Sequence, residues 1–133
     1  MGCKSHENRD LVFCYNVRMD KYQLTVQKRA KKQQETLDKR REKAWQLAQT
    51  AATTLKEEFG ALRVAIFGSL VQPNLFHRRS DVDLAVWGLA ESDYYRAVSH
   101  LLSLGPDISV DLVEMERASA RLCEKIEREG QLI

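Results

Sequence analysis

Three aspartates in the second half of the chain have the spacing of a metal-binding carboxylate cluster. Asp81 and Asp83 stand at the start of an apolar run of strand character, residues 82–87. Side chains alternate between the two faces of a strand, so both carboxylates point to the same side. Asp111 interrupts a second apolar run, 107–113, where a lone carboxylate is costly to bury unless it is paired or metal-bound. If these two strands are neighbours, the carboxylates meet in one cluster.

Carboxylates that lie close together repel each other and raise each other's pKa unless a cation lies between them. Mg²⁺ suits such a place, because it takes oxygen ligands and is often held by one or two carboxylates together with substrate phosphates. We therefore expect Asp81, Asp83 and Asp111 to be metal ligands and catalytic residues, with Mg²⁺ as the cofactor.

A Gly-Ser pair lies where the strand expected over 62–67 ends. Gly68 allows another group to approach the backbone closely, and Ser69 offers a hydroxyl and an amide N–H. A helix that begins at this point would direct its free N–H groups at an anion. We expect Gly68 and Ser69 to bind the phosphates of a nucleotide, because a phosphate site next to a metal site indicates a nucleoside triphosphate.

This combination of Gly-Ser, an eleven-residue gap, Asp-x-Asp and a distant third aspartate resembles the DNA polymerase beta-type nucleotidyltransferase superfamily. Within it, the chain is similar to the MNT-type (minimal nucleotidyltransferase) domain proteins, over roughly residues 45 to 130. Many members carry Arg-Gly shortly after Gly-Ser, whereas this chain has Gln72-Pro73. That departure leaves open how the loop turns and how tightly it binds phosphate.

The resemblance implies Mg²⁺-dependent transfer of AMP from ATP to a hydroxyl group. Stand-alone MNT-type proteins are commonly antitoxins of HEPN-type ribonuclease toxins, and they adenylylate a tyrosine of the toxin. Only about one helix is expected after Asp111, which is too little for a separate acceptor-binding domain. ATP and a HEPN-type toxin are therefore the expected partners.

Two alternative functions stay open at this stage. An antitoxin with a degenerate catalytic site would block its toxin by binding alone. The departure at Gln72-Pro73 leaves this interpretation open. A transferase for a small hydroxylated molecule is the other alternative, although the missing acceptor domain argues against it.

The apolar periodicity predicts an α/β fold, a small mixed β-sheet of three to four strands with helices packed on one face. This is the core expected of a polymerase beta-like nucleotidyltransferase. Its expected helices and strands cover residues 36–59, 62–67, 82–87, 91–104, 107–113 and 116–129.

The N-terminal residues 1–35 are expected to be a polar, partly basic extension, and residues 36–133 to be the nucleotidyltransferase domain. Residues 1–19 are interpreted as an unstructured leader. The basic run 28–43 favours a solvated helical extension, with an arm that contacts RNA or a partner as the alternative. A net charge of +2 gives no overall field for nucleic acid, so direct nucleic-acid binding stays open.

The three cysteines are odd in number and form no Cys-x-x-Cys, which is typical of a reducing cytosol. No apolar run approaches the roughly 18 residues of a membrane span. We therefore expect a cytoplasmic protein that does not interact with a membrane.

Overall fold

The computed structural model describes the backbone of residues 2–133 and the side chains from residue 21 onward. The chain divides into two compact units, of which the first ends at Asp38 and the second begins at Lys39. The first unit is helical throughout its described residues, and every residue from 21 to 36 is exposed.

Helix α1 covers Gly2–Glu58, so the prediction of an unstructured leader is wrong for residues 2–19. Neither glycine nor proline occurs between residues 3 and 59, and nothing in that stretch therefore breaks a helix. The helix ends at Glu58, two residues before Gly60, whose φ is +71°, and the N–H of Ala61 donates to the carbonyl of Leu55 at 2.9 Å. A glycine with positive φ commonly follows the end of a helix.

The second unit contains a four-stranded sheet in the order β3-β2-β1-β4. Its strands are β1 (Arg63–Phe67), β2 (Val82–Trp87), β3 (Val110–Glu114) and β4 (Gln131–Leu132). Strand β1 is antiparallel to both β2 and β4, whereas β2 and β3 are parallel. The predicted small mixed sheet is confirmed, and β4 is a strand that the sequence reasoning missed.

The remaining elements are η1 (Gly68–Val71), η2 (Glu91–Asp93), α2 (Tyr94–Leu104) and α3 (Ala120–Glu129). Helix α2 forms the crossover between the parallel strands β2 and β3. Helix α3 begins four residues later than predicted, because Ser119 is its N-cap and accepts a hydrogen bond from the N–H of Leu122 at 3.2 Å.

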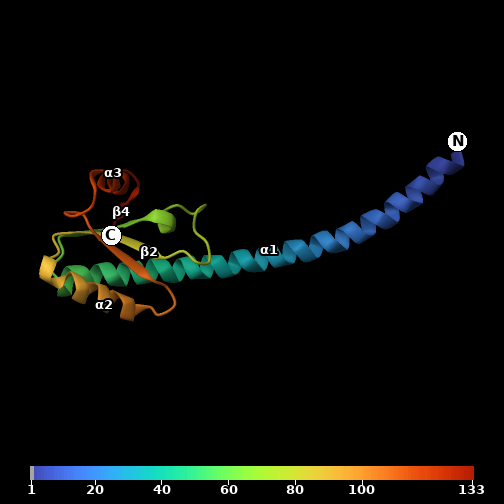
Figure 1. Ribbon diagram of the computed structural model, residues 1–133. Helices are drawn as coiled ribbons and strands as arrows, with labels where there is room; N and C mark the ends of the chain where they lie inside the picture. The colour runs from blue at the N-terminus through green and yellow to red at the C-terminus, as the bar shows by residue number, and fades with distance from the viewer. Residues whose placement is uncertain (1) are drawn as a thin grey trace. The chain divides into compact units, whose positions relative to one another are not determined.

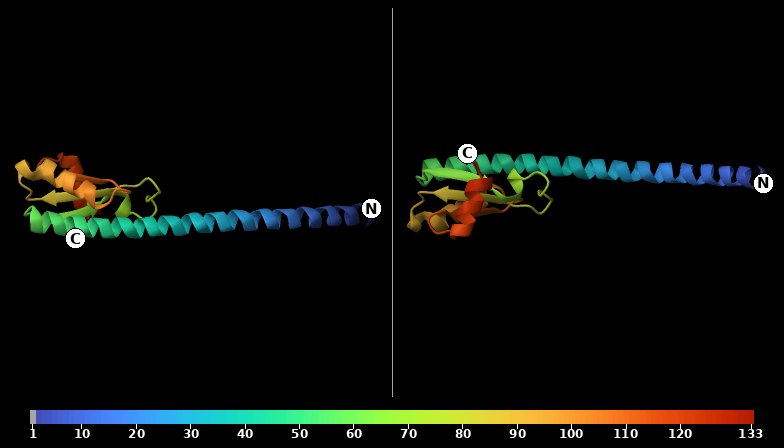
Figure 2. Two further views of the ribbon diagram at one scale, coloured as in Figure 1. Left: turned by 90° about the horizontal axis from the view of Figure 1, so that it is seen from below. Right: turned by 90° about the horizontal axis from the view of Figure 1, so that it is seen from above.

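Helices cover both faces of the sheet, which differs from the prediction that they pack on one face. The part of α1 that belongs to the second unit lies with α2 on one face, and α3 lies on the other (Figures 1 and 2). Ala65 and Ala85 form a cluster with Ile126 of α3 on that second face. Successive apolar side chains of a strand point to opposite faces of the sheet and are buried on both, so helices must cover both faces. No helix within the described part of the chain is long and apolar enough to cross a membrane.

Within the second unit, two arginines of α1 bind the loops. Arg40 Nη2 donates to the carbonyl of Ser80 at 3.1 Å, and Arg41 Nη2 donates to the carbonyl of Leu70 at 3.4 Å. Both side chains are half-buried, in contrast to the exposed cations earlier in the helix.

Deleting residues 1–35 should leave the second unit folded, because residues 21–36 are exposed and their removal uncovers no described core residue. Deleting residues 1–43 should instead lower the free energy of unfolding by about 1–3 kcal/mol, because the hydrogen bonds of Arg40 and Arg41 are lost. Thermal unfolding followed by circular dichroism compares the two. Loss of the transition in the shorter deletion would show that the extension is part of the fold.

Candidate active site

The carboxylates of Asp83 and Asp111 are brought together by strand register. Asp83 of β2 lies directly opposite Asp111 of β3 in the parallel pair, and opposite Phe67 of β1 on its other side. Asp81 precedes Asp83 by two residues and so points to the same face. All three predicted acids therefore lie at one end of the sheet, where β1 leads into η1.

Asp83 is the most strongly perturbed acid of this group. Its pKa is raised from 3.8 to about 6, first by burial and then by the negative charges of Asp111 and Asp81. A hydrogen bond to the Asp111 carboxyl raises the pKa further, and the positive charge of Lys125 acts in the opposite direction. A proton at Asp83 thus relieves a repulsion that a cation between the carboxylates would also relieve.

The chemistry of these donors fits a hard divalent cation such as Mg²⁺. Among the described residues, no three Asp, Glu, His or Cys side chains already form a metal site. The negative charges of Asp111 and Asp81 raise the pKa of Asp83, and a bound cation would remove that repulsion. The three aspartates would supply the oxygen ligands that Mg²⁺ prefers.

Gly68 is required at its position for two separate reasons. Its φ is +76°, a backbone conformation that residues other than glycine rarely adopt. A Cβ atom at this position would also lie 2.3 Å from Oδ2 of Asp83. The glycine predicted to lie against phosphate therefore also makes the space for the carboxylate.

Ser69, which is predicted to bind phosphate together with Gly68, lies next to that glycine in η1. The following residue, Leu70, is fully buried and fixes this turn to the core. Ser69 itself is half-buried, and its carbonyl accepts a hydrogen bond from the N–H of Gln72 at 3.2 Å. The Gly-Ser pair thus lies in a short, anchored turn beside Asp83.

Gln72, one of the two residues that differ from the family pattern, binds helix α3. Its Nε2 donates to Oε2 of Glu129 on α3 at 3.1 Å. The loop after η1 is thereby tied to the last turn of α3, on the face of the sheet that carries the aspartates. Sequence spacing gives no sign of this contact, because 57 residues separate the two partners.

Ser80 and Arg40 position the segment that precedes Asp81, and sequence reasoning missed both. The Ser80 side chain is buried, and its Oγ accepts from the N–H of His77 at 2.9 Å. The Ser80 N–H donates to the His77 carbonyl at 2.9 Å, which closes a turn. Arg40, the donor to the Ser80 carbonyl, lies within a basic run that gives no hint of such a partner.

The fold and the paired acids beside a Gly-Ser turn define a nucleotidyltransferase-type site, and comparison with known proteins agrees. The polymerase beta nucleotidyltransferase family matches residues 49–133. The chain belongs to this family. A search of curated proteins found no significant match.

Solved structures of similar fold include a protein described as a putative minimal nucleotidyltransferase, with 33% identity and a TM-score of 0.50. That match covers 73% of this chain and 92% of the other. A toxin–antitoxin crystallised with AMP-PNP matches with 28% identity and a TM-score of 0.53, covering 62% of this chain and 69% of that one. A mutant of the toxin–antitoxin MntA–HpeT matches with 27% identity and a TM-score of 0.51, over 61% and 66% of the two chains.

The raised pKa of Asp83 makes the stability of the metal-free protein depend on pH. Between pH 3.8 and about 6 the folded state holds a proton that the unfolded state has lost, so stability falls as pH rises. Asp83→Asn should remove this dependence of stability on pH. The variant should exceed wild type by on the order of 1 kcal/mol at pH 7.5, since solvent screens a half-buried group, and lose this advantage near pH 3.5.

Urea unfolding in EDTA at both pH values measures this difference. Asp107→Asn is the matched control, because Asp107 is an exposed aspartate outside the cluster. A gain in stability that is equal at both pH values would contradict the proposed repulsion.

Gly68→Ala should disrupt the site more than the general strain of a positive φ can explain. Gly60→Ala is the matched control, because Gly60 has a φ of +71° and a Cβ atom there would meet no heavy atom within 4 Å. Both variants should lose about 1 kcal/mol of stability from backbone strain. Only Gly68→Ala should also lose nucleotidyl transfer, by at least about tenfold, because its methyl group displaces Asp83. Equal transfer rates in the two variants would refute this steric role.

Proposed function

We propose that this protein transfers AMP from ATP to a hydroxyl group on a partner protein, as the antitoxin of a HEPN-type toxin. The observation that carries the proposal is the direct pairing of Asp83 with Asp111 beside Gly68, within a fold of the nucleotidyltransferase family. Two facing carboxylates, of which Asp83 has a raised pKa, are poorly placed for stability alone and well placed for holding cations against phosphate.

The reaction divides its roles among residues at one end of the sheet. The acceptor oxygen attacks the α-phosphorus in line, the bond from that phosphorus to the bridging oxygen breaks, and pyrophosphate leaves with the electron pair. Asp111 is exposed and therefore accessible to accept the hydroxyl proton. Gly68 and Ser69 bind the β- and γ-phosphates.

Asp81, Asp83 and Asp111 would hold Mg²⁺, which neutralises phosphate charge and favours the deprotonated acceptor when it is bound. Asp83 must then be ionised, so a proton and the metal ion compete for the same carboxylate. Its pKa of about 6 allows ionisation at neutral pH, even before the cation adds its own attraction.

The assignment to a protein acceptor is supported by the kind of structures that this chain resembles. One relative at 28% identity is a toxin–antitoxin crystallised with AMP-PNP, a non-hydrolysable ATP analogue. A partner that brings its own hydroxyl to the open carboxylate edge would complete the site. Strand β3 lies at the edge of the sheet, so a partner can approach Asp111 from that side.

The test mixes substoichiometric protein with a co-purified toxin partner, ATP and Mg²⁺, and weighs the toxin by intact-mass spectrometry. Adducts of one AMP residue should accumulate well beyond one per molecule of this protein. Asp83→Asn should reduce transfer by about a thousandfold or more, because an amide removes a charge that the metal requires. Glu127→Gln, which removes an exposed carboxylate of α3, should retain wild-type transfer.

A toxin that stays unmodified, and is neutralised only at equal or higher amounts of this protein, would reject catalysis and favour inhibition by binding. Wild-type transfer by a folded Asp83→Asn variant would reject the assignment of the carboxylates instead.

A further inference from the structure

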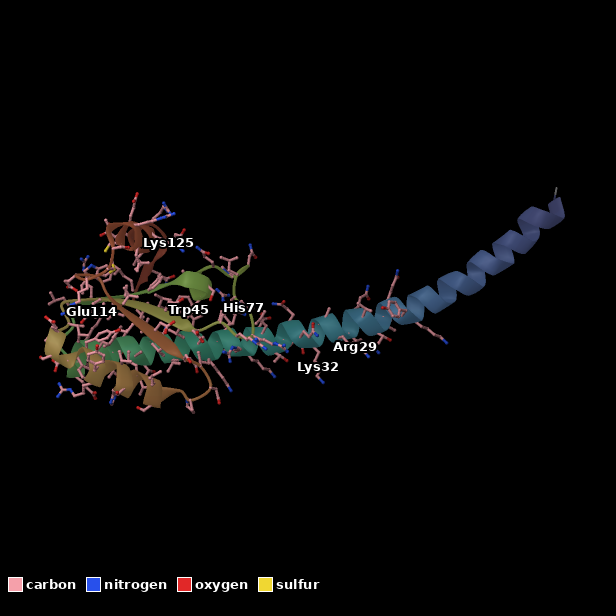
Figure 3. The ribbon with its side chains drawn as sticks, in the orientation of Figure 1. Arg29, Lys32, Trp45, His77, Glu114 and Lys125 are labelled. Carbon is pink, nitrogen blue, oxygen red and sulfur yellow. The ribbon has the colours of Figure 1, made fainter. Side chains whose placement is uncertain are left out.

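The exposed part of α1 contains a stretch of helix whose side-chain charges are all positive. Residues 21–34 include Lys21, Lys28, Arg29, Lys31 and Lys32, and no aspartate or glutamate. All five side chains, here called the basic cluster, are exposed, and Figure 3 labels Arg29 and Lys32 among them. Their combined charge of +5 exceeds the +2 of the whole chain. The rest of the chain is therefore negative overall, and positive charge is concentrated in this stretch.

The cations of the basic cluster repel one another. Lys28 precedes Lys31 and Lys32 by three and four residues, which are the spacings at which side chains on a helix are neighbours. Like charges at these spacings destabilise a helix. None of the five cations forms an ion pair with a residue whose side chain the structure describes, although Glu35 lies four residues from Lys31. A ligand that brings negative charge would relieve this repulsion.

The length of the basic cluster matches a polyanion with closely spaced charges. Lys21 and Lys32 are eleven positions apart, which is about 16 Å along the helix axis at about 1.5 Å per residue. One strand of a nucleic acid carries about five phosphates over that length, at about 3.4 Å each. The helix thus offers one cation for roughly each phosphate of a strand that lies along it.

The side of the helix opposite the basic cluster is too polar to enter a membrane. A helix that lies in a membrane interface needs large apolar residues on the side away from its cations. Leu24 and Val26 are two positions apart and so point to different sides of the helix. Tyr22 and Ala30 lie on the side of Val26, together with glutamines at positions 23, 27, 33 and 34. Amide and phenol groups suit the phosphate and sugar oxygens of a nucleic acid instead.

We propose that the basic cluster of α1 binds the phosphate backbone of a nucleic acid, independently of base sequence. The lysine ammonium groups and the Arg29 guanidinium donate charge-assisted hydrogen bonds to phosphate oxygens. The cluster precedes residue 49, where the match to the nucleotidyltransferase family begins, so it is an addition to the catalytic domain. This binding activity does not depend on the proposed transfer of AMP.

The experiment measures binding of the full chain to fluorescently labelled single-stranded RNA of about 20 nucleotides, and to DNA of the same sequence, by fluorescence anisotropy between about 50 and 200 mM salt. One variant combines Lys28→Gln, Lys31→Gln and Lys32→Gln, because glutamine favours a helix as lysine does. A matched variant changes the same three lysines to arginine and keeps the charge. Lys56→Gln removes an exposed cation of the second unit as a further control. Circular dichroism confirms that each variant is helical and folded.

For wild type, the logarithm of the RNA association constant should fall against the logarithm of salt concentration with a slope between about −3 and −4, since each neutralised phosphate contributes about −0.7. The glutamine variant should have a slope between about −1 and −2 and bind about a hundredfold more weakly at the lowest salt. The arginine variant and Lys56→Gln should each bind within about twofold of wild type. RNA and DNA should bind alike if phosphates alone are contacted, whereas tighter binding of RNA would add a contact to the 2′-hydroxyl.

Wild-type affinity and salt dependence in the glutamine variant would overturn this assignment, as would a wild type that binds neither RNA nor DNA. Binding to phosphatidylserine vesicles without binding to either nucleic acid would assign the basic cluster to a membrane surface. Competition by poly-glutamate that equals that of unlabelled RNA at the same total charge would show that an acidic protein suffices. Each of these two results would also reject the nucleic-acid site.

Discussion

The repulsion between Asp83 and Asp111 is the constraint on which the rest of the site depends. Parallel pairing of β2 and β3 places the two carboxylates directly opposite each other, and the partial burial of Asp83 prevents water from screening its charge fully. Such a pair is unfavourable unless a proton or a cation lies between its members. Val82 and Leu84, the neighbours of Asp83, are fully buried on the opposite face and fix the strand despite this cost. Gly68 leaves room for the carboxylate of Asp83, which a Cβ atom at that position would displace.

Much of this site could be predicted because it depends on local rules. The alternation of side chains along a strand places Asp81 and Asp83 on one face, and the apolar neighbours of Asp111 mark its strand. The family and the mixed sheet follow from the same motif and are confirmed. The catalytic and metal-binding roles of the individual residues remain predictions.

Contacts between distant segments could not be predicted in the same way. The hydrogen bonds from Arg40 to Ser80 and from Gln72 to Glu129 join residues that are 40 and 57 positions apart in the sequence. The donors lie in polar segments that resemble any exposed segment, so the sequence does not indicate their partners. Helix α2 contains two adjacent tyrosines that its sequence does not distinguish, and Tyr95 is 81% exposed. Its neighbour Tyr94 is the inward tyrosine, with its hydroxyl donating to the carbonyl of Leu112 at 3.0 Å. Periodicity identifies an apolar side of a helix but not where its tertiary partner ends.

Helix α3 covers the face of the sheet on which Asp83 lies, because Asp83 and Ala85 are two positions apart in β2 and Ala85 packs with Ile126 of α3. Ala65 and Ala85 make this arrangement possible, because their small side chains let Ile126 and therefore α3 approach the sheet. A larger residue at either position would move Lys125 away from Asp83. The packing of the core and the charge balance of the site are thus set by the same residues.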